Sequence, residues 1–286
     1  MLGRVAVVLL AASTALATQA ARGNSTCSRK FLEEAATRYV VSQSTGQLGW
    51  IKSLLASNVT YFENGKITDF DTGSLNQSVK IDHSRSTYDT TACASFTEII
   101  SSNPQRPRII GTQLRYADAK IVKIDSIATG ANDWLFNASH TLHYALQESW
   151  DPIPAKKRDS RDVIKAAGDA YFDYMKNQSV VVPWGSPCTR LEGGAYTGRG
   201  FANDTCNLGI PPGSNMSTPD RRYVIDENYG TVSILTYFGG LGNAPDSHEF
   251  RVEGGKLRFI HTMTYCGSKF NCGLTRPAVI SEDLGY

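Results

Sequence analysis

The chain has 286 residues, enough for one large or two small hydrophobic cores. Its formal net charge of +2 excludes a strongly basic nucleic-acid-binding protein and a polybasic membrane anchor. Hydrophobic residues make up 41% and charged residues 20%, the balance of an ordinary globular protein.

Residues 1–21 have the pattern of a secretory signal peptide. Arg4 precedes a short apolar run over residues 5–10, and small residues stand at Ala17, Ala20 and Ala21. This apolar run is too short to span a membrane, and no later stretch reaches 18 apolar residues. We therefore predict a protein that is secreted or travels the secretory pathway, with no membrane span.

Cysteines and glycosylation motifs agree with an oxidising route. The six cysteines allow fifteen pairings, of which we favour the local ones, Cys27–Cys93, Cys188–Cys206 and Cys266–Cys272. Any acceptor that carries a glycan must lie on the surface, although some motifs are expected to be chance matches. Asn-x-Ser/Thr acceptors stand at Asn24, Asn58, Asn76, Asn137, Asn177, Asn203 and Asn215.

The first half of the mature chain reads as a helix followed by strands. Residues 28–44 carry apolar side chains at three- and four-residue spacing after a candidate N-cap, Ser28. A polar stretch over 64–91 is expected to be loop with short strands. Further helices are expected over 48–55 and 93–100, and strands over 59–63, 108–116, 119–127 and 134–148.

The pattern restarts after a linker, residues 151–158. A helix over 162–176 has apolar residues at the same offset as the helix over 28–44, and a Gly/Asn/Pro-rich segment follows over 182–217. Strands are then expected over 222–226, 231–238, 248–253 and 256–266.

A second likeness between the halves supports an internal duplication. The sequence His140-Thr-Leu-His-Tyr in the first half matches His261-Thr-Met-Thr-Tyr in the second. We therefore predict an α+β fold of two tandem, cone-shaped half-barrels over 22–150 and 159–286. Each would be a helix packed on a curved, mostly antiparallel sheet.

A tight hairpin is expected at Gly254-Gly255, because two alternating runs flank these glycines. Cross-strand neighbours on one face lie about 4.5–5.5 Å apart, so this turn would place two histidines side by side on an apolar face. The register pairs Val252 with Leu257, Phe250 with Phe259, and His248 with His261.

The inner face of the strand expected over 134–148 follows from its glycosylation motif. If Asn137 carries a glycan, its face points outward, because side chains alternate along a strand. Trp134, His140 and Tyr144 would then point inward.

Three residues are candidates for catalysis. His248 and His261 suit a general base or a hydrogen-bond donor, because the ordinary pKa of histidine lies near working pH. Arg190 lies in a segment, 182–196, that would form a loop at the mouth of the barrel. From there Arg190 would hold a carbonyl or enolate oxygen of the ligand. The alternatives are buried histidines tied to backbone carbonyls or tyrosine hydroxyls, and a structural loop in which Arg190 only pairs with Glu192.

Several familiar motifs are missing from the sequence. There is no nucleophile elbow, no H-E-x-x-H, no P-loop and no dinucleotide fingerprint. We therefore expect no cofactor and no metal, so that catalysis would use acid–base groups, hydrogen bonds and shape. The predicted substrate-binding residues are Trp134, His140, Tyr144, Trp184, Phe250, Phe259 and Tyr265.

Two stretches resemble signature segments of a secreted fungal family, most of whose members have no assigned function. They are Val-Pro-Trp-Gly-Ser-Pro-Cys-Thr-Arg-Leu-Glu-Gly-Gly (182–194) and Pro-Asp-Ser-His-Glu-Phe-Arg-Val-Glu-Gly-Gly-Lys-Leu-Arg-Phe-Ile-His-Thr (245–262). The resemblance covers nearly the whole mature chain and is sharpest in the second half. The half-barrels also resemble the nuclear-transport-factor-2-like cone, whose curved sheet and helix hold an apolar pocket. Positions that match the family's motifs are Trp184, Arg190, Glu192, His248, Arg251 and His261.

The resemblance implies a function, because some similar secreted proteins are hetero-Diels–Alderases of tropolone–sesquiterpenoid pathways. We therefore expect a cofactor-independent cyclase that joins apolar intermediates, such as a tropolone quinone methide and a humulene-type sesquiterpene. Such a cycloaddition needs a dry, shaped cavity and donors that polarise the oxygenated diene.

Two other functions stay open at this point. One is a secreted, non-enzymatic binding protein for a small apolar ligand. The other is an acid–base isomerase or dehydratase, which needs a carboxylate beside His248 or His261, with Asp226 and Glu227 as candidates. The expected partner is a small apolar molecule rather than a nucleic acid, and a homodimer is left open.

Overall fold

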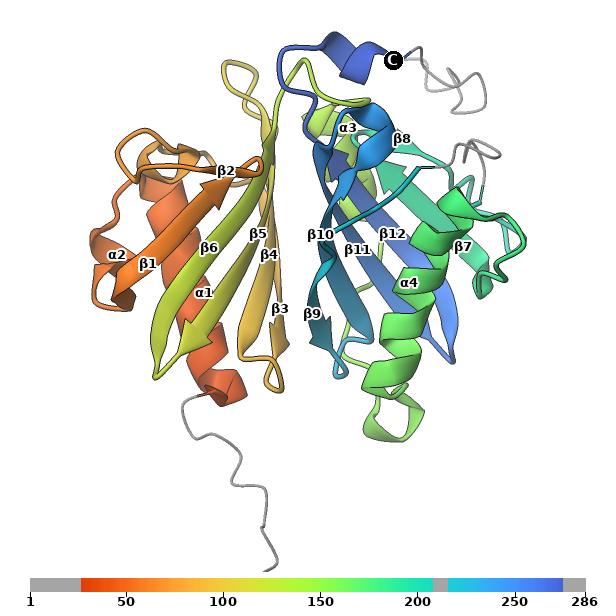
Figure 1. Ribbon diagram of the computed structural model, residues 1–286. Helices are drawn as coiled ribbons and strands as arrows, with labels where there is room; N and C mark the ends of the chain where they lie inside the picture. Colours follow the sequence, from red (N-terminus) through yellow and green to blue (C-terminus); the bar gives the residue numbers. More distant parts are fainter. Residues whose placement is uncertain (1–26, 208–215, 275–286) are drawn as a thin grey trace, which may run out of the picture.

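Two halves of one design lie side by side in the protein (Figure 1). The computed structural model describes residues 27–207 and 216–274; the predicted signal peptide lies outside them. We call residues 27–129 the first half and residues 161–264 the second half. Each half has one long helix, α1 (Arg29–Thr45) or α4 (Arg161–Lys176), packed on a six-stranded sheet. The predicted α+β class with two tandem halves is therefore confirmed.

The two sheets have the same strand order. In the first half it is β2-β1-β6-β5-β4-β3, and in the second half β8-β7-β12-β11-β10-β9. One pairing in each sheet, β1 with β6 and β7 with β12, is parallel, and the others are antiparallel. The first sheet consists of β1 (Leu55–Glu63), β2 (Lys66–Ile67), β3 (His83–Asp89), β4 (Ala94–Ser101), β5 (Arg108–Ala117) and β6 (Lys120–Thr129). The second consists of β7 (Trp184–Glu192), β8 (Ala195–Tyr196), β9 (Arg222–Asp226), β10 (Thr231–Phe238), β11 (Ala244–Glu253) and β12 (Lys256–Thr264).

Short helices complete the described chain. The helix α3 (Ala138–Ala145) belongs to the connection between the halves and contacts β4 on one side and β7 and β8 on the other. The remaining short elements are α2 (Gly49–Lys52), η2 (Ser74–Asn76), η3 (Ala155–Lys157), η4 (Gly239–Leu241) and η5 (Phe270–Gly273).

The duplication extends to local details. The helices begin after Ser28 and Ser160, whose hydroxyls accept hydrogen bonds from Phe31 and Val163 and so satisfy free N–H groups of the first turn. The pairings of β5 with β6 and of β11 with β12 both contain a one-residue register shift close to the hairpin turn. The two halves thus share caps and irregularities as well as topology.

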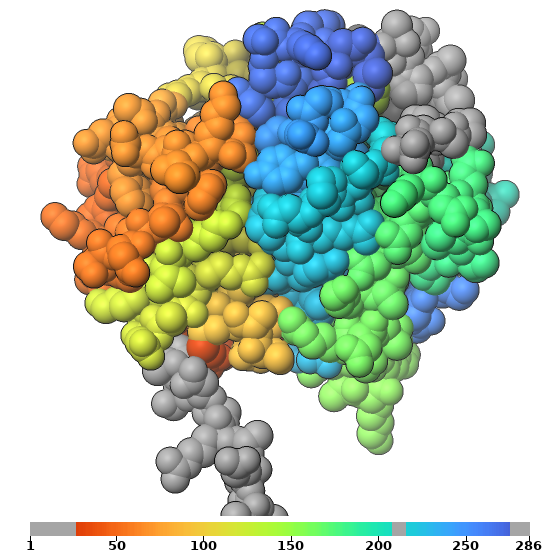
Figure 2. All heavy atoms as spheres, in the orientation of Figure 1, coloured from red at the N-terminus to blue at the C-terminus, as the bar shows by residue number. Residues whose placement is uncertain are grey.

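The halves contact each other reciprocally, as the subunits of a symmetric dimer do. Arg161, the first residue of α4, donates two hydrogen bonds of 2.8 and 2.7 Å to Asp89 at the end of β3. Arg29, the first residue of α1, pairs with Asp226 at the end of β9. Figure 2 shows the atoms of the two halves meeting along one central seam.

The backbone repeats this exchange across the same seam. Asp89 accepts from the N–H of Ile225 at 2.9 Å, and Asp226 accepts from the N–H of Tyr88 at 2.9 Å. Each carboxylate therefore receives an arginine and a backbone N–H from the other half. The seam is built like the interface of a dimer whose subunits have been joined into one chain.

Two secondary-structure predictions are wrong. The expected strand over 134–148 contains the helix α3, which Asn137 caps by accepting from the N–H of His140 at 3.1 Å. The sequence His140-Thr-Leu-His-Tyr is thus helical, whereas the similar sequence that begins at His261 is part of the strand β12. The strand that takes the place of β12 in the first sheet is β6. The expected helix over 93–100 is the strand β4, all eight residues of which are buried, because α1 covers one face and the second half covers the other. Burial on both faces removes the alternation that identifies a strand.

The predicted hairpin register is also wrong beyond its turn. Val252 does pair with Leu257, but the next pair is Arg251 with Phe259, so that Arg258 forms a bulge. A one-residue slip sends every later side chain to the opposite face of the sheet. His248 consequently pairs with Thr262, and Glu249 pairs with His261. The two histidines lie on opposite faces of the second sheet.

The three favoured disulfides are all present. Cys27–Cys93 joins the N-terminus of α1 to the loop before β4 with a sequence separation of 66, whereas Cys266–Cys272 has a separation of 6 and Cys188–Cys206 a separation of 18. A crosslink restricts the unfolded chain more strongly when its loop is longer. The longest crosslink should therefore contribute most to stability.

Removing the Cys27–Cys93 disulfide is expected to lower the free energy of unfolding more than removing the Cys266–Cys272 disulfide. Loop entropy predicts about 4 kcal/mol for the double Cys→Ser variant of the first pair and about 2 kcal/mol for the second. Equilibrium unfolding in guanidinium chloride under non-reducing conditions measures both values. An equal loss for the two variants would contradict this prediction.

Of the seven predicted glycosylation acceptors, five lie in the described residues. Asn58, Asn76, Asn177 and Asn203 are exposed, as a glycan requires, and Asn137 is half-buried at the start of α3. Asn24 and Asn215 lie outside the described residues. Because Asn137 precedes a helix, the argument from strand alternation for the direction of Trp134, His140 and Tyr144 does not hold.

Candidate functional site

A histidine–carboxylate pair lies between α4 and the second sheet. Asp246 and His248 stand two residues apart on β11, so their side chains share a face. The carboxylate Oδ1 of Asp246 lies 2.5 Å from Nδ1 of His248, and its Oδ2 accepts from the hydroxyl of Thr264 on β12 at 2.6 Å. The hydrogen bond described for the imidazole engages Nδ1, so Asp246 fixes the ring and directs Nε2 away from itself.

Aromatic rings surround this pair. The ring centroids of Phe172, Tyr171 and Phe250 lie 4.8, 5.3 and 5.7 Å from that of His248. The two α4 residues come from the predicted apolar stripe, of which Val163 is exposed and the other members are buried: Ile164, Ala167, Tyr171 and Phe172. The His248 side chain is 3% exposed, so the pair sits in an apolar, low-dielectric environment where hydrogen bonds and charges act strongly.

A second polar group, Arg190, faces the same interior from β7. Its Nε donates to Glu192 at 3.0 Å and its Nη1 to the backbone carbonyl of Cys206 at 2.9 Å. Burial lowers the pKa of Arg190, but Tyr171 and Glu192 outweigh that effect and raise it, so the guanidinium stays charged. The other oxygen of Glu192 accepts from the indole N–H of Trp134 at 2.6 Å.

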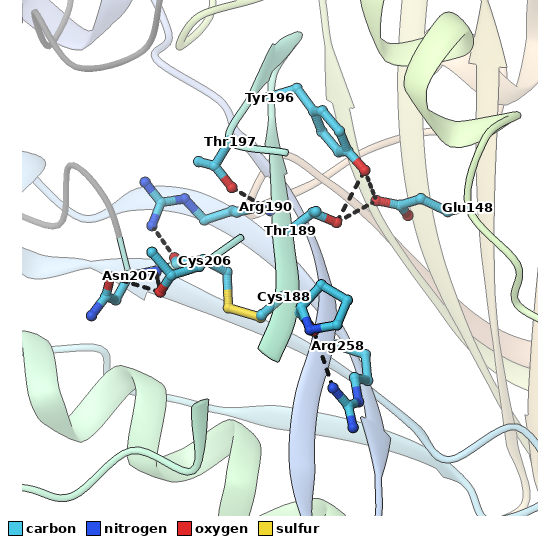
Figure 3. Close-up of a disulfide and its surroundings, with 11 residues drawn as sticks. Glu148, Cys188, Thr189, Arg190, Tyr196, Thr197, Cys206, Asn207 and Arg258 are labelled. Atoms are coloured by element: carbon cyan, nitrogen blue, oxygen red, sulfur yellow. Dashed lines mark hydrogen bonds between the residues drawn. A yellow bond between two sulfur atoms is a disulfide. The ribbon is translucent and has the colours of Figure 1, made fainter. Parts of the chain in front are cut away.

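The segment that carries Arg190 is a strand, not the loop that its glycines and prolines suggested. Figure 3 shows Arg190 and Thr189 on opposite sides of β7, with Arg190 reaching toward Cys206 and Thr189 toward Glu148. The disulfide Cys188–Cys206 fixes the segment that provides the carbonyl partner of Arg190. Trp184 opens the strand and packs edge-on against Tyr171 at 5.9 Å.

The other predicted catalytic histidine, His261, lies in a separate cluster between the two sheets. Its Nδ1 is 2.9 Å from Glu98 on β4, and its Nε2 is 2.7 Å from Glu148. Burial alone lowers the pKa of His261, but the two carboxylates outweigh it and raise the pKa to about 10. The imidazole is therefore protonated at neutral pH and holds both carboxylates.

More charged groups complete this inter-sheet cluster. Arg85 on β3 pairs with Glu98 at 3.1 Å and with Glu249 on β11 at 2.8 Å. The guanidinium of Arg85 stacks over the ring of Trp150 at 3.5 Å from its centroid. Burial raises the pKa of Glu249, whereas for Glu98 the effect of burial is overcome by His261 and Arg85, which lower it.

The remaining predicted substrate-binding residues are dispersed. Phe259 packs against Trp150 in the inter-sheet cluster at 5.5 Å, and Tyr144 on α3 stacks on Tyr196 at 4.2 Å. His140 is half-buried on α3, and Tyr265 borders a hollow at the end of the first sheet. Trp184 and Phe250 belong to the core between α4 and the second sheet, and Trp134 contacts Glu192, the partner of Arg190.

Sequence reasoning missed Asp246 as the partner of His248. Alternation along β11 could have found it, because residues two apart on a strand share a face. The suggested carboxylate Asp226 pairs instead with Arg29 at the seam, and Glu227 accepts from the N–H of Arg161. The partners of His261, Glu98 and Glu148, lie far from it in the sequence and carry no local signal.

One family model, of unknown function, is similar to the second half of the chain. A family profile described as "Domain of unknown function (DUF8021)" matches residues 157–264. No curated protein matches the chain.

Similar solved structures match about a third of the chain. An NTF-2 like protein of unknown function from Burkholderia xenovorans LB400 is 12% identical, with a TM-score of 0.28 over 36% of this chain and 85% of that one. One from Shewanella baltica OS155, also NTF2-like and of unknown function, is 13% identical with a TM-score of 0.27 over 36% and 94%. A DUF4783 family protein from Bacteroides ovatus ATCC 8483 is 11% identical with a TM-score of 0.24 over 32% and 93%.

Across residues 27–207 and 216–274, no helix is long and apolar enough to cross a membrane. The same residues contain no group of three or more His, Cys, Asp or Glu side chains arranged to hold a metal ion.

Proposed function

We propose that the protein is a cofactor-independent cyclase that acts on a small, largely apolar substrate inside its second half. The observation that carries this proposal is the Asp246–His248 contact of 2.5 Å in an aromatic surrounding. A carboxylate that holds one imidazole nitrogen leaves the other aligned for proton transfer or for donation to a substrate oxygen.

Arg190 supplies the second element of the proposed mechanism. Its guanidinium is held in place by Glu192 and the carbonyl of Cys206. The guanidinium therefore needs to reorganise little when negative charge develops on a substrate oxygen. In a hetero-Diels–Alder reaction, His248 and Arg190 would polarise the oxygenated diene, and the aromatic side chains would align the two apolar partners. The likeness to the secreted fungal family adds the substrate class, a tropolone quinone methide and a humulene-type sesquiterpene.

A second function, an acid–base isomerase or dehydratase, is favoured by the same histidine–carboxylate contact. The two reactions differ in the fate of the hydrogens bound to carbon. An isomerase or dehydratase exchanges a carbon-bound proton with solvent, whereas a concerted cycloaddition leaves carbon-bound hydrogens in place. Mass spectrometry of the product formed in deuterium oxide distinguishes the two reactions, because only the isomerase or dehydratase incorporates deuterium at carbon.

Replacing His248 by alanine is expected to lower turnover about 10²–10⁴-fold, the usual contribution of a positioned acid–base group. The assay mixes the purified protein, a tropolone quinone-methide precursor and humulenol, and follows product rate and stereochemistry. His143→Ala is the matched control, because His143 lies on the exposed face of α3.

Two results would overturn the cyclase proposal. One is a wild-type rate and stereochemistry equal to those of the uncatalysed mixture. The other is full activity in a His248→Ala variant whose circular dichroism shows a folded chain. Absence of turnover together with thermal stabilisation by humulenol would instead support a binding protein.

A further inference from the structure

A hollow of about 360 Å³ opens at the end of the first sheet. Because β1 and β6 are parallel and β5 runs the other way, the last residues of β1 and β6 and the first of β5 meet at this end. The chain that follows β12 closes the other side with Tyr265 and Gly267. Figure 1 shows these segments together at the upper end of the molecule.

The lining of the hollow is polar and of mixed charge. Glu63 comes from the end of β1, Arg108 from the start of β5, and Gln77 from the segment after η2. Asp133 lies among them but is already engaged, because it accepts from the N–H groups of Gly130 and Cys266 at 2.7 Å each. The lining therefore includes a free carboxylate oxygen, an amide, a guanidinium and one tyrosine.

Several of these groups retain hydrogen-bonding capacity toward the hollow. Oε2 of Glu63 accepts from the backbone and hydroxyl of Ser74 and from Tyr61, while the contacts found in the described chain leave its Oε1 unused. Among the described residues, the guanidinium of Arg108 makes one hydrogen bond, from Nη1 to the carbonyl of Pro107 at 3.2 Å. Donors and acceptors are thus available side by side.

We propose that this hollow binds a neutral, hydroxyl-rich ligand of the saccharide class. A sugar hydroxyl both donates and accepts, which matches the adjacent carboxylate, amide and guanidinium. A sugar ring also has an apolar face that packs on an aromatic ring such as Tyr265. Carboxylates on the lining oppose an anionic ligand, and the hollow is at the small end of ligand pockets.

Glu63 and Arg108 lie on different walls of the hollow. They stand on strands separated by β6, and Arg108 is four residues along β5 from Thr112, which pairs with Ser126 opposite Glu63. Two strand spacings across the sheet and four residues along it place their backbones about 16 Å apart. A ligand that contacts both side chains must bridge the two walls, which we expect of a mono- or disaccharide-sized molecule.

A saccharide at this place has two potential sources. One is a free sugar. The other is a glycan on Asn76, a predicted acceptor that is exposed and lies next to Gln77 on the rim. If Asn76 carries a glycan that occupies the hollow, Asn76→Gln will bind an added sugar more tightly than the glycosylated chain. Equal affinity assigns the site to a free sugar.

The test is calorimetric titration of the full chain with cellobiose and, separately, with chitobiose. We expect binding of at least one probe, and at least a tenfold weaker affinity for Arg108→Gln and for Tyr265→Ala. The matched control is Arg106→Gln, because Arg106 is exposed in the same loop but does not line the hollow. Failure of both probes to bind to the wild-type chain and to Asn76→Gln, or binding that survives both Arg108→Gln and Tyr265→Ala, overturns the proposal.

A measurement on the wild-type chain tests the proposal even if the variants do not fold. Titration of ¹⁵N-labelled protein with the probe that binds should shift the amide signals of Asn64, Gly130 and Gly267, which border the hollow. Shifts confined to residues elsewhere in the chain overturn the proposal. None of the residues that line the hollow belongs to the proposed cyclase site around Asp246, His248 and Arg190. Absence of sugar binding would therefore leave the proposed function of His248 unaffected.

Discussion

Replacing Asp89 by alanine is expected to destabilise the protein by about 3–5 kcal/mol, because it breaks a buried ion pair from one side. Asp89 is 0% exposed and accepts two hydrogen bonds from Arg161 and one from the N–H of Ile225, all from the second half. It also holds its own turn by accepting from Thr91 and Ala92. Without the carboxylate, these donors lose their partner inside the seam.

Chemical denaturation with parallel fluorescence and circular dichroism measures the loss. Asp71→Ala is the matched control, because this exposed aspartate should change stability by no more than about 0.5 kcal/mol. Asp226→Ala should resemble Asp89→Ala, since Asp226 takes the reciprocal place with Arg29 and Tyr88. A value for Asp89→Ala as small as that of the control would show that the seam does not depend on these carboxylates.

Replacing His261 by alanine is expected to cost a similar amount, about 3–5 kcal/mol, for an electrostatic reason. The imidazolium links Glu98 and Glu148, whose side chains are 2% and 1% exposed. Removing it leaves Arg85 as the only cation described in contact with Glu98, and leaves Glu148 with neutral donors. The expected result is lower stability in urea or heat, with His143→Ala unchanged as the control.

The same cluster predicts a pH dependence of defined sign. The folded-state pKa of His261, about 10, lies above its ordinary value of 6.5, so its stabilising contribution is complete below pH 6.5. That contribution is lost as the pH rises from 6.5 through about 10. The free energy of unfolding should therefore fall over this window by a few kcal/mol in the wild type.

A His261→Gln variant tests the assignment of this slope. Its stability should be lower below pH 6.5 and should lack the His261 share of the decline toward pH 10. On the acid side, the lowered pKa of Glu98 predicts loss of stability as the pH falls below its ordinary value of 4.5, while the raised pKa of Glu249 acts in the opposite sense. A wild-type curve that stays level between pH 6.5 and 10 would contradict the proposed charge state of His261.

The local chemistry of the sequence determined a large part of the fold. Serine caps and apolar stripes located α1 and α4, and Gly254-Gly255 located the turn between β11 and β12, because these features depend on neighbours within a few residues. The favoured cysteine pairs were also correct.

Only the tertiary structure decided which side chains meet at the candidate sites. The bulge at Arg258 has no signal in the alternating pattern, yet it turns His261 away from His248 and toward the first half. Burial on both faces of β4 concealed both the strand and the role of Glu98. The Asp246–His248 pair is local and was readable from its two-residue spacing. The cluster around His261 instead needs contacts between two sheets whose residues lie far apart in the sequence.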